Sequence, residues 1–379
     1  MPHPTFRSRI LAMALCCLAL ILSAFSPALA QKEARVAIVL PFKATGEEGR
    51  LSLDFYRGFL LAADHLKSQG ISARITALDE GQESAYIDPA LNAAAPSADA
   101  LVGFAFHSHA LEAAKFGLSH EMPVVFPLAQ SIKTGMESNA YAAFLVPDDE
   151  AWAQGISQML TGALGRTQVL VLQSETTEMS QRTQRLTELL DKSGAKVKVL
   201  PISATPYNIA DALSSKRMNL VVTAATEKDI LRNVAQKLRS VGQANPKKTL
   251  AVVGHPAWYD YYKTGELKWE DVEVYIPVMN FYNIASEQTK TLMEQYSYWF
   301  RTKPADTIPH SFLLGYDAGM HIIARLAEEG RGFLKDEKKY GGLYTDIILK
   351  QSHKSSCRSN HAVRLLNIKA SGAIDLLAF

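Results

Sequence analysis

The sequence predicts an α/β protein with two lobes, each built around a doubly wound parallel sheet. Apolar, strand-like stretches alternate with amphipathic helical stretches along most of the 379 residues, which is the pattern of βαβ units. The alternation restarts after a helix expected at residues 151–164. Removal of an expected leader at residues 1–30 leaves 349 residues, which is long for one hydrophobic core. We therefore expect a second lobe of the same design.

The expected leader has the features of an export signal. Two arginines precede an apolar run at residues 10–25, and residues 26–30 supply the small residues after which signal peptidase cleaves. The run is too short for a stable membrane span. A lipid anchor needs a small residue just before its cysteine, but Cys16 and Cys17 follow Leu15 and Cys16 and lie deep in the run. We expect a soluble protein in the periplasm, with no membrane insertion of the mature chain.

Charge and cysteine content restrict the function classes. Two of the 40 basic residues lie in the leader, so the mature chain has 38 basic and 38 acidic residues. A chain without net charge lacks the excess of basic residues that attracts nucleic acid or an anionic membrane. We therefore expect neither partner. Only Cys357 lies outside the leader, so the mature chain cannot form an internal disulfide and depends on its core for stability.

The first lobe is expected to begin with a buried strand and an amphipathic helix. Phe55, Phe59, Ala62 and Leu66 recur at helical spacing within residues 51–67 and form one apolar stripe. Gly70 is expected to cap this helix at its carboxyl end. The other expected elements are strands at 35–42, 73–78, 100–104, 124–126 and 142–146, and a helix at 109–120.

The second lobe and the end of the chain continue the pattern. Residues 352–360 are polar and serine-rich, which is typical of a hairpin or an exposed loop. The expected strands are 168–172, 197–200, 220–223 and 250–253, with strand-like alternation at 344–349 and 362–366; the expected helices are 151–164, 180–193, 287–300 and 312–328.

An ordered series of short motifs resembles the type I periplasmic binding proteins, the family of leucine/isoleucine/valine-binding proteins that serve ABC transporters. The resemblance spans nearly all of the mature chain and depends on several weak motifs. These are residues 36–42 with 56–62, 99–103, 122–127, 144–149, and the Leu-Gly-Tyr-Asp-Ala-Gly stretch at 314–319.

The resemblance implies two lobes joined by a multi-strand hinge. It places residues 31–147 and 281–335 in the first lobe, and residues 148–280 and 336–379 in the second. It also implies that a small polar ligand, amino-acid-like or related, is captured between the lobes and presented to an inner-membrane ABC permease or a receptor. The opening motif is similar to lipoprotein activators of peptidoglycan synthases as well, which use this fold without transport.

The chain departs from the family where amino-acid binders hold the ligand carboxylate. The usual Gly-Pro and Ser after the third strand are replaced by residues 103–108, Gly-Phe-Ala-Phe-His-Ser, and the usual Thr after the fourth strand is replaced by Gln130-Ser131. These departures put an α-amino-acid ligand in doubt but leave the predicted fold unchanged.

Candidate ligand residues follow from the rule that ligands bind at the carboxyl ends of strands in doubly wound sheets. Ser108 and Ser131 are either helix N-caps or donors to a ligand anion, assisted by backbone N–H groups at the helix starts. Glu175 suits a ligand ammonium group. The complete set is Lys43, Thr45, His107, Ser108, Gln130, Ser131, Glu175, Thr226, His255, Trp258, Tyr259 and Tyr282.

Trp258, Tyr259, Tyr261 and Tyr262 form the densest aromatic group of the sequence. Such rings either stack on a sugar or a ring-bearing ligand or pack the hinge or a lobe surface. Both interpretations remain open at the level of the sequence.

Metal and catalytic motifs are weak or missing. His353, Cys357 and His361 are four residues apart, which would align zinc ligands on a helix, but the intervening residues predict an exposed loop. Gly117–Glu121 lacks the last glycine of a nucleophile elbow, and His120-Glu121 lacks the second histidine of a zincin. We expect no enzyme, no metal and no cofactor.

Two functions are consistent with the sequence. The first is a periplasmic solute-binding protein that closes on its ligand by a hinge motion. The alternative is a ligand-free interaction or scaffold module of the cell envelope that uses the same fold.

Overall fold

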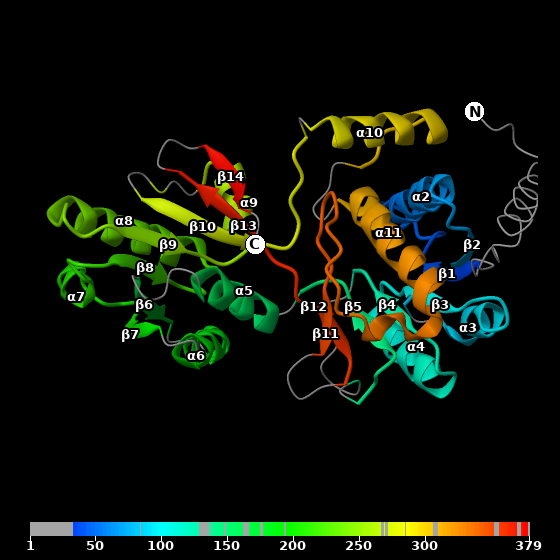
Figure 1. Cartoon of the computed structure of the whole chain (residues 1–379), viewed down its shortest axis with the longest axis horizontal. Coiled ribbons are helices and arrows are strands. Elements are labelled where there is room, and N and C mark those ends of the chain that lie inside the picture. The colour runs from blue at the N-terminus through cyan, green and yellow to red at the C-terminus, as the bar shows by residue number, and fades with distance from the viewer. Residues whose placement is uncertain are drawn as a thin grey trace, which may run out of the picture.

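A computed structural model describes residues 33–377, except residues 84, 129–135, 137, 148, 162–166, 175–176, 193–194, 267–268, 270–271, 285, 306–309, 352–355 and 370–372. Within these residues the chain forms two mainly parallel seven-stranded sheets, each covered by helices. The two sheets belong to separate lobes, with α2 and α11 on one and α5 to α9 on the other (Figure 1).

The sheet of the first lobe has the strand order β11-β12-β5-β4-β3-β1-β2. Every neighbouring pair is parallel except β11 with β12. Its strands are β1 (Ala34–Leu40), β2 (Ala73–Asp79), β3 (Ala100–Gly103), β4 (Val124–Phe126), β5 (Ala142–Phe144), β11 (Leu349–Gln351) and β12 (Arg358–Asn360).

Helices cover both faces of this sheet because β1 is apolar on both. Val36, Ile38 and Leu40 pack with the residues of two helices, α2 (Glu47–Ser68) and α11 (Ser311–Glu329). Ala37 and Val39 alternate with them and pack with residues of α3 (Asp88–Ala94) and α4 (His107–Ser119). Helix α10 (Glu287–Phe300) lies against α2, and the 3₁₀ helix η2 (Gly330–Lys335) follows α11.

The second lobe repeats the arrangement with the strand order β14-β13-β10-β9-β8-β6-β7. The pairs of β13 with β10 and with β14 are antiparallel, and the others are parallel. Its strands are β6 (Thr167–Gln173), β7 (Lys196–Pro201), β8 (Met218–Val222), β9 (Leu250–Val253), β10 (Glu273–Val278), β13 (Arg364–Ile368) and β14 (Ile374–Leu377). Its helices are α5 (Asp149–Thr161), α6 (Thr177–Lys192), α7 (Pro206–Ala212), α8 (Lys228–Ala244) and α9 (Trp258–Lys263).

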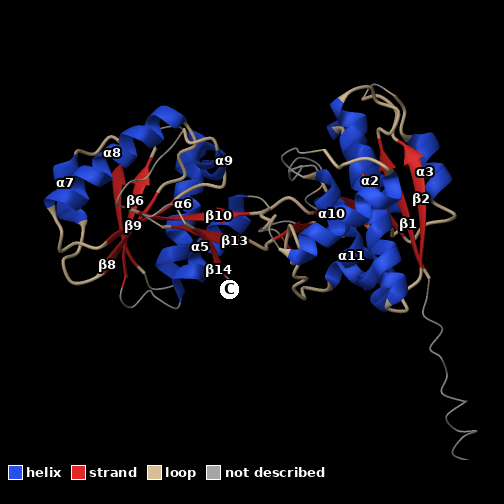
Figure 2. Ribbon diagram, turned by 90° about the horizontal axis from the view of Figure 1, so that it is seen from above, coloured by secondary structure: helices blue, strands red, loops and turns tan. Residues whose placement is uncertain are grey.

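The chain passes between the lobes three times: after β5, after β10, and between β12 and β13. In each case it leaves at the carboxyl end of a strand, so this edge of each sheet is the one next to the other lobe. Figure 2 shows the lobes from a second direction, joined by these extended segments.

The end of the chain is divided between both sheets. The first lobe includes β11 and β12, and the second includes β13 and β14. The expected placement of residues 336–379 in the second lobe is therefore wrong for β11 and β12. These two strands pair antiparallel and extend the edge of the first sheet, because β12 pairs in parallel with β5.

Glycines allow α2 and α11 to approach closely. A Cβ on Gly58 would lie 2.1 Å from the carbonyl oxygen of Phe312, and a Cβ on Gly315 would lie 2.1 Å from that of Phe55. Any larger side chain at either position would force the helices apart. The position of α11, and of the residues it carries toward the hinge, therefore depends on these two glycines.

Candidate functional site

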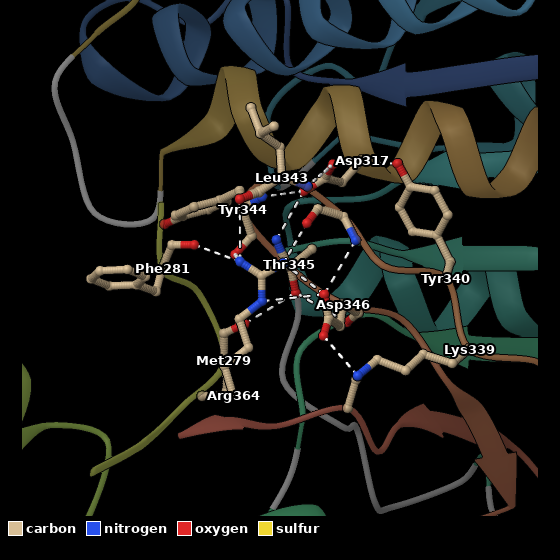
Figure 3. A network of polar contacts seen from close by, with 12 residues as sticks. Met279, Phe281, Asp317, Lys339, Tyr340, Leu343, Tyr344, Thr345, Asp346 and Arg364 are labelled. Atoms are coloured by element: carbon tan, nitrogen blue, oxygen red, sulfur yellow. Dashed lines mark hydrogen bonds and ion pairs between the residues drawn. The ribbon is translucent and has the colours of Figure 1, made fainter. Parts of the chain in front are cut away.

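Arg364, at the start of β13, holds the inter-lobe segments together (Figure 3). Its guanidinium group is buried and donates to the carbonyl oxygen of Phe281 at 2.6 Å, and to those of Gly342, Leu343 and Tyr344. It also forms an ion pair with Asp346 at 2.6 Å. One side chain therefore links the segment after β10 to the segment before β11 and to β13.

Asp317 joins the same network from the first lobe. Its carboxylate, on α11, accepts hydrogen bonds from the backbone N–H groups of Leu343 (2.9 Å), Tyr344 (2.7 Å) and Thr345 (2.8 Å). The side chain is completely buried. Burial raises the pKa of Asp317 to about 6, although the three N–H donors act in the opposite direction. Asp317 thus attaches the segment 343–345 to α11.

Asp346 completes the hinge network, which we define as Asp317, Lys339, residues 343–346 and Arg364. Burial alone would raise the pKa of Asp346, but the hydrogen bonds and charges of Arg364 and Lys339 hold it below its usual value. Asp346 is therefore ionised at neutral pH and balances the buried charge of Arg364.

On the first lobe, the predicted residues Lys43 and Thr45 lie after β1 and are exposed. The backbone N–H of Lys43 donates to Asp79 at the end of β2, at 3.0 Å, and its ammonium group lies 3.8 Å from the same carboxylate. Both residues are placed where a ligand at the carboxyl edge of the sheet could contact them.

His107 and Ser108 form the exposed first turn of α4. The N-cap position belongs to Phe106, so the N-cap interpretation of Ser108 is wrong; its hydroxyl donates instead to the carbonyl of Glu83 at 3.4 Å. The pair remains accessible at the carboxyl end of β3.

A buried carboxylate uses two backbone donors just before α4. Glu80 accepts hydrogen bonds from the N–H groups of Ala105 (2.9 Å) and Phe106 (3.2 Å) and contacts Nδ1 of His109 at 3.0 Å. Burial raises the pKa of Glu80, and these donors oppose the shift. These two amides are therefore occupied by the chain's own side chain, whereas the expectation that amides of the helix itself assist a ligand anion stays a prediction. Sequence reasoning missed Glu80, since nothing in its spacing connects it to residues 105 and 106.

Three predicted residues, Gln130, Ser131 and Glu175, lie outside the described residues. Their assignment as ligand contacts remains a prediction.

On the second lobe, Thr226 and His255 are half-buried at the carboxyl ends of β8 and β9. The carbonyl oxygen of Thr226 accepts a hydrogen bond from the Tyr261 hydroxyl at 3.2 Å, and Nδ1 of His255 accepts from the backbone N–H of Ala257 at 3.2 Å. Both lie on the same edge of the sheet as α9.

Trp258 is a core residue and offers no exposed ring surface to a ligand. It is fully buried, its Nε1–H donates to the carbonyl of Ala225 at 2.7 Å, and its ring stacks on Trp269 at 5.1 Å. The prediction that Trp258 contacts a ligand is thus contradicted by its packing. The neighbouring aromatic residues lie on different faces of α9, because the helix turns Trp258 into the core while Tyr259 remains half-buried.

Tyr259 and Tyr282 belong to a group of rings that connects the second lobe to the first. Tyr259 lies 6.0 Å from Phe281, measured between ring centroids, and Tyr282 lies 5.9 Å from Tyr344 and 5.5 Å from His310. We call these five residues the crossover aromatic cluster. Sequence reasoning missed Phe281, His310 and Tyr344, because only the fold brings these three separate segments together.

The described residues contain no group of three or more histidine, cysteine, aspartate or glutamate side chains suited to a metal ion. Cys357 is buried, and Nδ1 of His361 contacts Oε1 of Gln154 at 2.9 Å. The expectation of an exposed loop is therefore wrong for Cys357, while His353 lies outside the described residues. None of the helices in the described part of the chain is long and apolar enough to cross a membrane.

Comparison with solved structures identifies the fold of this chain. No family model and no curated protein match the sequence. A solved structure provisionally described as a branched-chain amino acid ABC transporter from Rhodospirillum rubrum is 15% identical, with a TM-score of 0.63 over 91% of this chain and 100% of its own. A branched-chain amino acid ABC transporter periplasmic ligand-binding protein from Burkholderia xenovorans is 12% identical, with a TM-score of 0.56 over 91% and 95%.

LpoA from Haemophilus influenzae has a similar structure as well. It is 13% identical with a TM-score of 0.59, and the match covers 94% of this chain but 62% of LpoA. At such identities the comparisons establish architecture, which agrees with the two seven-stranded sheets and the three inter-lobe segments. The chain has the type I periplasmic binding fold.

Proposed function

We propose that this chain is an exported solute-binding protein that captures a small polar ligand between its lobes and presents it to an inner-membrane ABC permease. The observation that carries the proposal is the arrangement of the strand ends. The chain crosses between the lobes at the carboxyl edges of both sheets, which is where ligands bind in doubly wound folds. The solved binding proteins of the same fold support it.

Lys43, Thr45, His107 and Ser108 are the proposed contacts on the first lobe, and Thr226, His255 and Tyr259 are those on the second. All are exposed or half-buried, so ligand contact requires no unfolding. Tyr282, with Gln130, Ser131 and Glu175, completes the proposed set. The proposal assigns binding to these residues and no catalytic step.

Ligand binding is expected to close the lobes, because a ligand that contacts both lobes stabilises the closed state by its differential affinity. We would measure thermal unfolding of the mature chain against a panel of amino acids, amides, sugars and organic cations, and small-angle scattering with any solute that raises the melting temperature. A raised melting temperature with a smaller radius of gyration supports the proposal. The absence of any shift across the panel, for a folded protein, contradicts it.

A second candidate function is an interaction module of the cell envelope. Tyr298 (68% exposed) and Trp299 (46% exposed) near the end of α10 give the first lobe an aromatic surface, and large exposed aromatics often mark protein contacts. The similarity to LpoA is consistent with this use of the fold. A pull-down from envelope extract that depends on Tyr298 and Trp299 and lacks permease components would favour the module, whereas recovery of permease components alone would favour transport.

A further inference from the structure

Helix α10 has one face packed on the first lobe and one face exposed, at the edge of the lobe shown in Figure 1. Leu292 and Tyr296 are buried. The Tyr296 hydroxyl accepts a hydrogen bond from Arg57 of α2 at 2.9 Å, and its ring lies 4.5 Å from that of Phe312 of α11. Exposed residues at alternate steps of four and three follow one stripe along the opposite side of the helix. This stripe consists of Glu287, Thr291, Glu294, Tyr298 and the C-cap residue Arg301.

Two large aromatic side chains lie uncovered near the end of the stripe. Tyr298 is 68% exposed, and Trp299, which lies beside the stripe, is 46% exposed. Rings of this size gain much from burial, and tyrosine, tryptophan and arginine are the residues that contribute most to binding at protein interfaces. The exposed face of α10 is therefore suited to contact with another protein surface.

Arg301 ends α10 in a backbone conformation that favours glycine. Its φ of 54° lies in the left-handed region. Glycine could make the same cap hydrogen bond, which the N–H of Arg301 donates to the carbonyl of Ser297 at 3.1 Å. The guanidinium carbon of Arg301 lies 5.0 Å from the centre of the Tyr298 ring. The helix end therefore does not require an arginine, and the side chain of Arg301 is held over the exposed ring.

The charges of the stripe have opposite signs on the two sides of Tyr298. Glu294 precedes Tyr298 by four residues, and Arg301 follows it by three. Among the residues that the structure describes, neither charged side chain forms an ion pair. An anionic surface, such as a layer of lipid headgroups, would attract Arg301 but repel Glu294. A stripe with both signs of charge instead fits a partner that also carries both signs.

We propose that α10 is a self-association site, at which the α10 helices of two copies of this chain pair antiparallel about a two-fold axis beside Tyr298. This arrangement places Glu294 of each copy opposite Arg301 of the other and brings the exposed rings together at the axis. A two-fold interface uses the same surface twice, so each favourable pair of charges forms twice, and the helix dipoles favour the antiparallel direction. The contact surface is small, so the dimer is reversible. The proposal goes beyond ligand capture and does not depend on it.

Sedimentation velocity of the mature chain tests the association at protein concentrations from roughly 1 μM to 1 mM. We expect the sedimentation coefficient to rise with concentration, as for a monomer in equilibrium with a dimer. Tyr298→Ser should weaken the association about tenfold or more, because it removes the ring next to the axis. The matched control is Tyr207→Ser, since Tyr207 is 81% exposed at the start of α7 in the second lobe. This control should leave the dissociation constant unchanged.

Two charge variants test the antiparallel arrangement. Glu294→Arg and Arg301→Glu each place like charges opposite one another when identical chains pair, so each is expected to weaken self-association about tenfold or more. An equimolar mixture of the two variants should associate within about threefold of the wild-type affinity, because every pair across the axis then joins opposite charges. Recovery on mixing also shows that neither variant lost association through misfolding.

Three outcomes overturn the proposal. A wild-type chain that stays monomeric at every concentration removes the dimer and leaves the exposed face of α10 to an envelope partner. A dimer that is insensitive to Tyr298→Ser has its contact elsewhere on the molecule. A mixture of the two charge variants that stays monomeric contradicts antiparallel pairing. None of these outcomes affects the proposed solute binding, which the ligand panel tests separately.

Discussion

Asp317 illustrates how a single buried carboxylate can fix a hinge. Three consecutive N–H groups converge on its two oxygens, and the Tyr340 hydroxyl lies 3.5 Å from one of them. Each residue of the Gly-Tyr-Asp stretch in α11 has a structural role. Gly315 lets α11 approach α2, the Tyr316 hydroxyl contacts Nδ1 of His65 at 2.6 Å, and Asp317 holds the segment before β11.

The pH dependence of stability should reveal Asp317. Its pKa is about 6 in the folded protein, above the ordinary 3.8, so the folded state binds the proton more tightly than the unfolded state. The contribution is greatest below pH 4 and is lost as the pH rises toward 6, by about 3 kcal/mol at most. Asp317→Asn cannot titrate and is expected to flatten the fall in unfolding free energy between pH 4 and 7, measured by urea denaturation at each pH.

The same variant should destabilise the protein at every pH in that range. An asparagine side chain has one acceptor oxygen and presents an NH₂ group to backbone donors, so some of the three N–H groups lose their partner at about 1–3 kcal/mol each. Parallel pH profiles for the wild type and Asp317→Asn would contradict the assignment of the pKa.

Trp258 and Tyr259 should differ in how strongly they respond to substitution. Trp258→Phe removes the hydrogen bond to Ala225 and reduces the ring area that stacks on Trp269, and it should lower the free energy of unfolding by about 2 kcal/mol. Tyr259→Phe keeps the ring of a half-buried residue and should change it by less than about 1 kcal/mol. Urea denaturation of both variants distinguishes the core residue from the half-buried one, and equal losses of unfolding free energy would contradict this difference in packing.

At the scale of elements, α2 and α11 pack closely because glycines lie at their contact. Gly315→Ala places a methyl group against the carbonyl oxygen of Phe55, so the helices must separate, and we expect a loss of about 1–3 kcal/mol in unfolding free energy. Gly242→Ala in α8 is the control, because nothing lies within 4 Å of its added Cβ. That substitution should stabilise the protein by up to about 1 kcal/mol through helix propensity; equal effects of the two would show that the contact is unimportant.

Periodicity predicted the regular elements because apolar alternation is local information. Residues 250–253 and 287–300 form the strand and the helix that were expected, and the first helix begins four residues before its expected start. The expected strand at 344–349 is largely absent, since residues 343–345 give their N–H groups to Asp317 instead of to a neighbouring strand.

The site was harder to predict than the fold. Loops at strand ends could be nominated from the pattern; Lys43, Thr226 and His255 lie in such loops, and His107 begins the helix after one. Burial of Trp258 and the hydrogen bonds from the amides of residues 105 and 106 to Glu80 depend on contacts between segments 25 or more residues apart. No local pattern in the sequence encodes such contacts.

At the scale of the whole molecule, the hinge network should make the lobes unfold together. Arg364 contacts segments from both lobes and is itself buried with its ion-pair partner. Arg364→Met leaves Asp346 buried without its main partner, which we expect to destabilise the protein by about 3–5 kcal/mol. Scanning calorimetry should show one transition for the wild type and two for Arg364→Met, because the lobes lose their coupling.

Arg232→Met is the matched control for this prediction. Arg232 is an exposed residue of α8, with 53% of its side chain accessible, and its loss should leave a single transition and change stability by less than about 0.5 kcal/mol. Two transitions in the wild type would show that the hinge network does not couple the lobes.

The division of the last strands between the sheets has a consequence for how fast the protein folds. β11 and β12 join the first sheet and β13 and β14 join the second, so each lobe pairs strands from one part of the chain with strands that come much later in it. The Asn360 side chain, for example, donates to the carbonyl of Leu145, 215 residues earlier. Such distant pairings have a high loop-closure entropy, so we expect both lobes to fold slowly for their size.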